Sequence, residues 1–153
     1  MSDPVHAAIV SLLEGIPAIG HVFPYEPYEA QADKTAKHYR YGDRLRGWWV
    51  SPIPTALEYP ASIGRGAKRN RRSEWTMTGY MELTESGASA IGFSILITEI
   101  EKAFREQPDL GITGVITVFD HRAGIETVSS GLVMFAGIVC HTVELNLTTQ
   151  QSI

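Results

Sequence analysis

The sequence lacks the features expected of secreted and membrane-spanning proteins. Cys140 is the only cysteine, so no internal disulfide can form, and synthesis in a reducing cytosol is expected. No apolar run approaches the roughly 20 residues that a helix needs to cross a bilayer. The first residues show no basic segment followed by an apolar stretch, so no signal peptide is predicted. These absences favour a globular protein made in a reducing cytosol.

Motifs that mark catalytic sites are also missing. The sequence has no G-x-S-x-G, no phosphate-binding loop and no G-x-G-x-x-G. Cys140 and His141 are adjacent, but successive side chains of a strand point to opposite faces, so this pair could not readily hold one metal. We therefore predict no enzyme activity, no metal and no cofactor. A small hydrolase built on Asp120, His121 and His141 is an alternative, although the sequence names no nucleophile for it.

Charge is unevenly distributed along the 153 residues. Residues 1–72 hold ten Lys and Arg against seven Asp and Glu, a net charge of +3. Residues 73–153 hold three against ten, a net charge of −7. Such an asymmetry favours head-to-tail contacts between copies, in which surfaces of unlike charge meet.

The most polar stretch is GRGAKRNRR, residues 64–72, which we predict to be an exposed, mobile loop. It holds five of the 13 basic residues, and these are candidates for contact with a partner: Arg65, Lys68, Arg69, Arg71 and Arg72. Contact with phosphate would make the protein a nucleic-acid-binding module. Docking on an acidic protein surface and a solvated loop without a partner are the alternatives, and the overall acidity of the chain argues against a dedicated DNA-binding protein.

The strongest local pattern predicts an amphipathic helix over residues 86–109. Its apolar side chains recur at i, i+3, i+4, i+7 and i+11: Phe93, Leu96, Ile97, Ile100 and Phe104. Four more apolar residues widen this face, so we expect much of the helix to be covered: Ala90, Ile91, Ile95 and Ala103. The hydroxyl of Thr84 or Ser86 can cap its start, and Pro108 ends it.

Runs of β-branched and aromatic residues, several of them alternating with polar ones, predict strands around this helix. They cover residues 19–23, 45–53, 74–83, 111–119 and 131–147, with short strands at 56–59 and 125–128. The last long strand is expected to be broken or bulged near Ala136 and Gly137.

These elements predict one α+β domain over residues 1–153. Strands 75–83, 113–119 and 132–147 would form a mixed or antiparallel sheet, with the long helix packed on one face. A short helix would open the chain, because Asp3 is a good N-cap and Pro4 is tolerated at the first helical position.

Trp48 and Trp49 would point to opposite sides of one strand. One would then belong to the core and the other to the outer face, where tryptophan is enriched at interfaces. Trp48 is taken as a candidate interface residue.

The order of these parts resembles the tail terminator, or tail completion, proteins of long-tailed bacteriophages. The resemblance rests on LLEGIP at the end of the first helix, on the strands GWWVSP and EWTMTGYMEL, on the helix FSILITEIEKAFREQPDLG and on the closing strand CHTVELNL. It spans most of residues 5–147, and the basic stretch 64–72 has no counterpart in it.

The resemblance implies a structural protein of the virion without a catalytic site. Proteins of this family are small α/β subunits that form a hexameric ring, which caps the finished tail tube and offers a surface to the neck proteins of the head. A homo-oligomer, the tail tube protein and a head–tail connector are thus the expected partners. DNA would pass through the ring lumen without specific binding, and no membrane is involved. The neck connector of the same particle is the alternative function.

Overall fold

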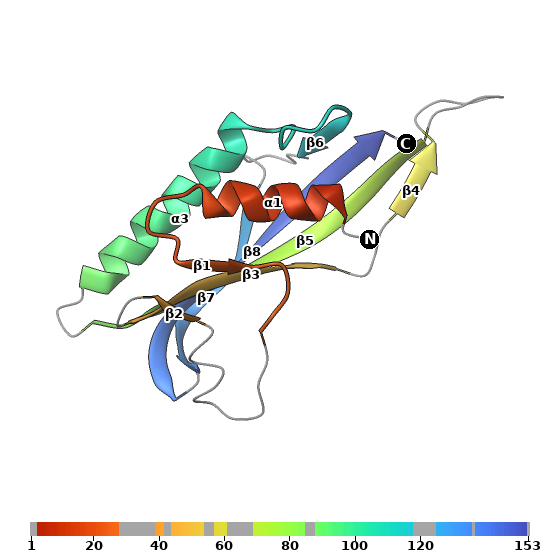
Figure 1. Cartoon of the computed structure of the whole chain (residues 1–153). Coiled ribbons are helices and arrows are strands. Elements are labelled where there is room, and N and C mark those ends of the chain that lie inside the picture. The colour runs from red at the N-terminus through yellow and green to blue at the C-terminus, as the bar shows by residue number, and fades with distance from the viewer. Residues whose placement is uncertain are drawn as a thin grey trace.

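The computed structural model describes residues 3–27, 39–41, 44–53, 57–60, 69–84, 88–117, 125–135 and 137–152. Its elements are listed here in chain order and drawn in Figure 1: α1 (Pro4–Glu14), β1 (His21–Phe23), β2 (Arg40–Tyr41), β3 (Arg44–Pro52), β4 (Leu57–Pro60), β5 (Arg69–Glu82), α3 (Ala88–Glu106), β6 (Val115–Thr117), β7 (Ile125–Phe135) and β8 (Ile138–Ser152).

The strands form one curled, mixed sheet with β5 and β8 at its centre. These two strands pair antiparallel from Asn70–Glu82 to Cys140–Ser152. On the other side of β5, β3 pairs antiparallel and β1 continues the sheet parallel to β3. On the other side of β8, β6 and β7 each pair antiparallel with a different part of that strand.

The predicted α+β class is wrong, because the protein is mostly β. About half of it lies in strands, against two described helices of 11 and 19 residues. The strand content exceeds the prediction at two places. Strand β5 begins at Arg69 within the stretch predicted as a loop, and residues 125–147 form two long paired strands rather than a short one followed by a long one. Gly137, where a break is predicted, lies between these two strands, and Ala136 lies outside the described residues.

Helix α1 is the short N-terminal helix that the sequence predicts. The Val5 N–H donates to Asp3 Oδ1 at 2.9 Å, so the aspartate caps the first turn. Val5, Ile9 and Leu13 are buried on its inner face, and the helix ends at Glu14, before Gly15.

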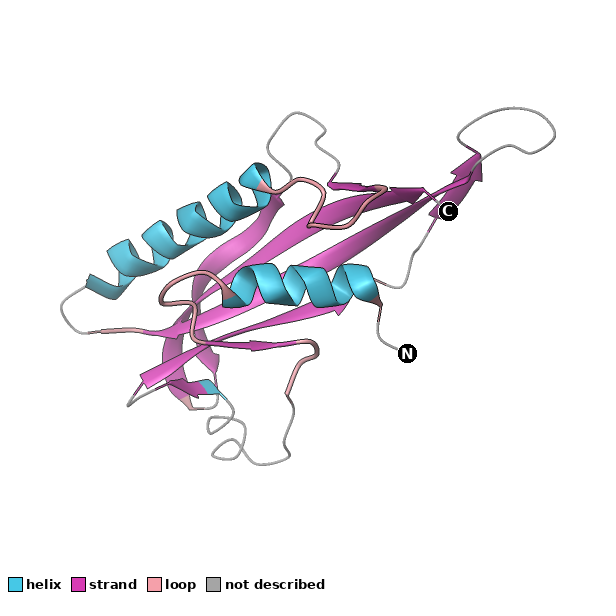
Figure 2. Ribbon diagram, turned by 45° about the horizontal axis from the view of Figure 1, so that its top comes forward, coloured by secondary structure: helices cyan, strands magenta, loops and turns pink. Residues whose placement is uncertain are grey.

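Helix α3 lies beside α1 over the same face of the sheet (Figure 2). Phe93, Leu96, Ile100 and Phe104 are buried, which confirms the predicted face. The expectation that Ile91 would also be covered is wrong, since it is 67% exposed on the side turned away from the sheet. Ala90 and Ile95 are exposed as well.

The two faces of the sheet carry different clusters of buried residues. The face under the helices holds the main core, in which Trp48, Met77 and Leu145 are fully buried. Gly79 is required there, because a Cβ at this position would lie 2.3 Å from the Trp48 ring. The opposite face holds a smaller aromatic cluster, in which the rings of Tyr80 and Phe135 stack with centroids 4.0 Å apart.

Candidate assembly interface

The structure divides the predicted basic site. Arg65 and Lys68 lie outside the described residues. Arg69, Arg71 and Arg72 lie in strand β5, so the predicted loop is wrong for residues 69–72. These residues pair with β4 on one side, and residues 70–72 also pair with β8 on the other. Main-chain hydrogen bonding on both sides makes them a strand although their side chains show no apolar alternation.

The prediction that Trp48 lies at an interface is wrong. Trp48 is fully buried in the main core, with its ring stacked on that of Phe93 at a centroid distance of 6.3 Å. The prediction that neighbouring tryptophans face opposite ways is confirmed, because Trp49 packs on the aromatic cluster of the other face.

The cysteine and histidines are held in structural contacts. Cys140 is buried in the aromatic cluster, and burial, with a smaller effect of Glu82, raises the pKa of its thiol to about 11. The neighbouring His141 faces the helices instead, with its ring on Phe93. Asp120 and His121 lie outside the described residues. Within the described ranges, no three His, Cys, Asp or Glu residues gather in a way that could hold a metal ion.

A serine that the sequence analysis missed locks helix α3 to the sheet. Ser89 Oγ accepts a hydrogen bond from the Thr84 N–H at 3.0 Å and lies 2.8 Å from His141 Nε2. In return, the Ser89 N–H donates to Thr84 Oγ1 at 3.1 Å, which confirms Thr84 as a capping residue. Since Ser89 is buried, its hydroxyl serves both groups and fixes the start of the helix.

Strand β7 is the least protected element of the described structure. It pairs with β8 along its length, and no other described strand pairs with its outer edge. All nine residues from 126 to 134 are exposed. Leu132 is 59% exposed and Met134 is 65% exposed. In Figure 1 this strand and the start of β8 extend below the sheet, away from both helices.

Folded proteins usually protect such an edge with a lysine, a proline, a bulge, a short strand or a covering element. Strand β7 has 11 residues and contains neither lysine nor proline. A bulge between Thr127 and Ser129 interrupts its register with β8, and the intervening Val128 is exposed. Beyond this bulge the register is regular, and the exposed Leu132, Val133 and Met134 make the edge a candidate surface for pairing with another chain.

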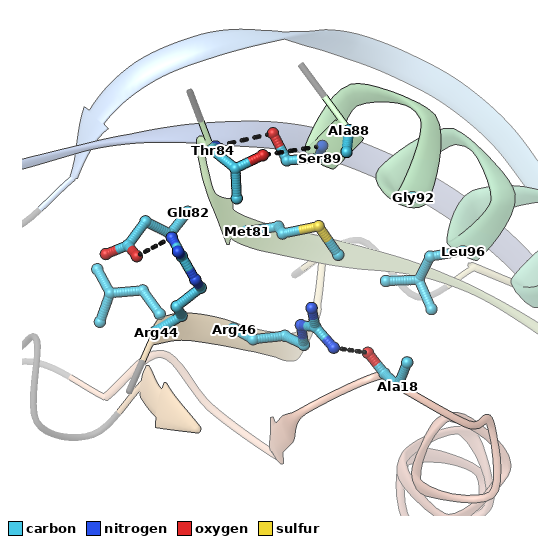
Figure 3. A pocket seen from close by; sticks show the side chains of 11 residues that line it. Ala18, Arg44, Arg46, Met81, Glu82, Thr84, Ala88, Ser89, Gly92 and Leu96 are labelled. Carbon is cyan, nitrogen blue, oxygen red and sulfur yellow. Dashed lines mark hydrogen bonds and ion pairs between the residues drawn. The ribbon is translucent and has the colours of Figure 1, made fainter. Parts of the chain in front are cut away.

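A pocket of about 280 Å³ opens beside the start of α3, and no residue of β7 lines it. We call it the Arg46 pocket. Figure 3 shows the side chain of Met81 between helix α3 and the arginines of β3, with Leu96 projecting from the helix. Arg44 pairs with Glu82 at 3.1 Å, and Arg46 donates to the Ala18 carbonyl at 3.3 Å.

The charge of the sheet differs between its two sides. Strands β1, β2 and β3 contain three arginines and no acidic residue: Arg40, Arg44 and Arg46. Strands β7 and β8 contain Glu126 and Glu144 and no lysine or arginine. The side that bears the exposed edge is therefore acidic, and the side that bears the Arg46 pocket is basic.

No protein-family model matches the chain, and no curated protein sequence matches it significantly. None of the helices in the described part of the chain is both long and apolar enough to cross a membrane.

Proposed function

We propose that this protein is a structural subunit of a bacteriophage tail, a tail terminator that assembles into a ring on the end of the tail tube. The single observation that carries the proposal is the edge of β7, which is long, apolar and exposed in the isolated subunit. In a monomer an edge of this kind promotes aggregation, and in an assembly it can pair with a neighbouring subunit. The resemblance of the sequence to tail terminator proteins is the reason for proposing a ring on the tail tube and not another assembly.

A ring is favoured over a two-fold dimer by the placement of the surfaces. The exposed edge and the basic side of the sheet are different surfaces of one chain. A contact between different surfaces is heterologous, and it produces a closed ring when the rotation between neighbours closes. The opposite charges of the two sides favour this head-to-tail contact over contact between like surfaces.

In this proposal, the ring joins the tube to the neck proteins of the head, and DNA passes through its lumen without sequence-specific contacts. Arg71 is exposed near one end of β5 and is a candidate for contact with the tube or with a neighbouring subunit. The protein would reside at the head–tail junction of the virion, and it would need no cofactor.

Light scattering after size-exclusion chromatography, with electron microscopy of the same fractions, tests the assembly. We expect a ring of about six copies, in equilibrium with monomer at low concentration. Purified tail tubes should be capped at one end. Capping of isolated necks but not of tubes would instead assign the protein as a neck connector. A protein that stays monomeric at high concentration and binds neither particle would refute the proposal.

The edge can be tested separately by placing charges on β7. The double variant Leu132→Asp, Met134→Asp should remain folded, because both side chains are exposed, yet it should fail to assemble. Ser11→Asp is the matched control, since it places a charge on an exposed position of α1. Normal rings from the double variant would show that this edge is not used.

A further inference from the structure

We propose that the Arg46 pocket receives Val128 of strand β7 from a neighbouring copy of this chain, with Glu126 of that copy binding Arg46. This inference rests on the proposed ring, for which it names the contact between subunits. Its evidence is the size and lining of the pocket, the bulge in β7 and the charges of the two surfaces.

The size of the Arg46 pocket points to a protein side chain. Its volume of about 280 Å³ lies at the lower end of the range of about 300–1,000 Å³ that is common for sites of small ligands, and it is large enough for one or two apolar side chains. Pockets that hold one or two anchoring side chains are typical of the centre of a protein interface. The floor is apolar, with Met81 and Leu96, so the anchoring side chain is apolar as well.

The rim of the Arg46 pocket adds a requirement for negative charge. Arg44 is paired with Glu82, so those two charges balance each other. Within the described residues, the one hydrogen bond of the Arg46 guanidinium goes to the Ala18 carbonyl at 3.3 Å. A guanidinium has five N–H donors, so Arg46 can still bind a carboxylate. The preferred occupant is thus an apolar side chain with an acidic neighbour.

Strand β7 carries this combination on its exposed surface. Glu126 and Val128 are both exposed, and two residues of strand separate their Cα atoms by about 7 Å. The register shift at Thr127/Ser129 leaves Val128 without a partner on β8. Bulges often re-aim a side chain, and this one turns an apolar residue outward beside the only acidic residue of the strand.

A neighbouring copy must supply this strand. The subunit's own β7 is held by pairing with β8 from Ile125 to Phe135, so it cannot reach the pocket without leaving the sheet. The acidic side of one subunit then meets the basic side of the next, which repeats around a ring. Leu132 and Met134 lie on the other face of β7 from Glu126, so in the same contact they would pack on a different part of the neighbour's surface.

Gly92 offers a way to close the Arg46 pocket without disturbing the fold. It lines the pocket, it is exposed, and an added Cβ would meet no atom within 4 Å. Gly92→Leu should fill the pocket and weaken ring formation at least tenfold, as measured by light scattering over a concentration series. Gly92→Ala is the matched control: it changes the backbone in the same way but adds little volume, so it should assemble normally. Thermal melting should show both variants folded.

Charge reversal tests the proposed ion pair. Arg46→Glu and Glu126→Arg should each weaken assembly, and the two changes together should restore at least part of it. Restoration would exclude a merely structural role for Arg46. If the wild-type protein forms rings and both Gly92→Leu and the single reversals assemble like it, this inference is overturned while the proposed function stands. A wild-type protein that never assembles overturns both.

Cysteine crosslinking then identifies the surfaces in contact. Ala88→Cys at the pocket and Val128→Cys on β7, placed in separate chains and mixed, should crosslink only between the two kinds of chain. Ser94→Cys, on the other flank of α3, is the control and should not react. The native Cys140 should not interfere, because its side chain is fully buried. Crosslinks from Val128→Cys alone would show a two-fold contact between β7 strands and overturn the proposal.

Discussion

Strands β5 and β7 both pair with β8 over a long stretch, yet one is the centre of the fold and the other is its most exposed part. Trp75, Met77 and Met81 of β5 are buried beneath the two helices. On β7, only Ile125 reaches the main core, and the next nine residues are exposed. Main-chain pairing therefore does not decide burial in this protein. On the face that bears the main core, burial depends on whether a helix covers that part of the sheet.

Apolar side chains are buried under the helices but exposed over much of β7. Under the helices they stabilise the subunit, whereas Leu132 and Met134 of β7 are mostly exposed within it. Each exposed leucine or methionine would contribute about 1.5–3 kcal/mol if it were fully buried in a contact. This stabilisation by burial is absent in the isolated subunit and would be gained only when a partner covers β7.

Removal of a large side chain from the core and from β7 should give the largest difference in the free energy of unfolding. Phe104→Ala, in the core, should lower the free energy of unfolding by about 3–5 kcal/mol, because it leaves a cavity. Met134→Ala, on β7, should change the stability of the monomer by less than about 0.5 kcal/mol, as exposed sites usually do. Urea unfolding at low protein concentration measures both. Similar losses would mean that β7 is covered within the subunit.

Two strand glycines provide a second contrast of smaller size. A Cβ on Gly79 would clash with the Trp48 ring, so Gly79→Ala should destabilise by about 1–3 kcal/mol through overpacking. A Cβ on Gly131 of β7 would meet no atom within 4 Å, so Gly131→Ala should leave stability nearly unchanged. Thermal melts of the two variants measure the difference. An equal shift would contradict the proposed close packing at Gly79.

The hydrogen bonds of Ser89 with Thr84 and His141, at the start of α3, should contribute a similar amount to the free energy of unfolding. Ser89→Ala removes the acceptor of the Thr84 N–H and the partner of His141 Nε2, which should cost about 1–3 kcal/mol. Ser94→Ala is the matched control, since Ser94 is exposed on the same helix. Hydrogen exchange should show that the loss in Ser89→Ala begins in the first turns of α3. Exchange that accelerates evenly over the whole chain would show that the Ser89 hydrogen bonds do not act locally on the start of α3.

Alkaline pH should lower the stability of the subunit through Cys140. Its pKa is raised from 9.0 to about 11 in the folded protein, so the folded state keeps a proton that the unfolded state releases. Stability is therefore fully present below pH 9 and falls as the pH rises from 9 to 11. Denaturation across this window should show a shallower decline in Cys140→Ala. The tyrosines of the aromatic cluster act in the same direction, because burial also raises the pKa of Tyr80.

Local patterns in the sequence predicted part of this fold. The buried face of α3 follows from its 3.6-residue period, and the opposed placement of Trp48 and Trp49 follows from strand geometry. The same period could not show that Ile91 faces solvent, because an apolar residue looks alike whether its partner is in the subunit or in another chain. Residues 69–72 were predicted as a loop because their own side chains show no strand pattern, and what makes them a strand is pairing with β4 and with the distant β8.

The candidate interface was harder to predict. Its pocket takes residues from the turn at Ala18, from β3, from β5 and from α3, which no single segment displays. The hairpin of β7 and β8 was only partly recognised, because Gly137 is the one strong turn residue at its tip. The basic stretch was visible in the sequence, but the exposed edge that carries the proposed assembly was not.

The pairing of β5 with β8 has a consequence for how the chain folds. Asn70 pairs with Ser152, so the centre of the sheet joins residues 82 positions apart, with α3, β6 and β7 between them. Contacts of such long range slow folding, because the loop must close before the pairs form. During that delay, a β7–β8 hairpin can already form from neighbouring residues, and its unprotected edge meets other unfinished chains. Rapid dilution should thus improve the yield of refolding more than it improves the rate.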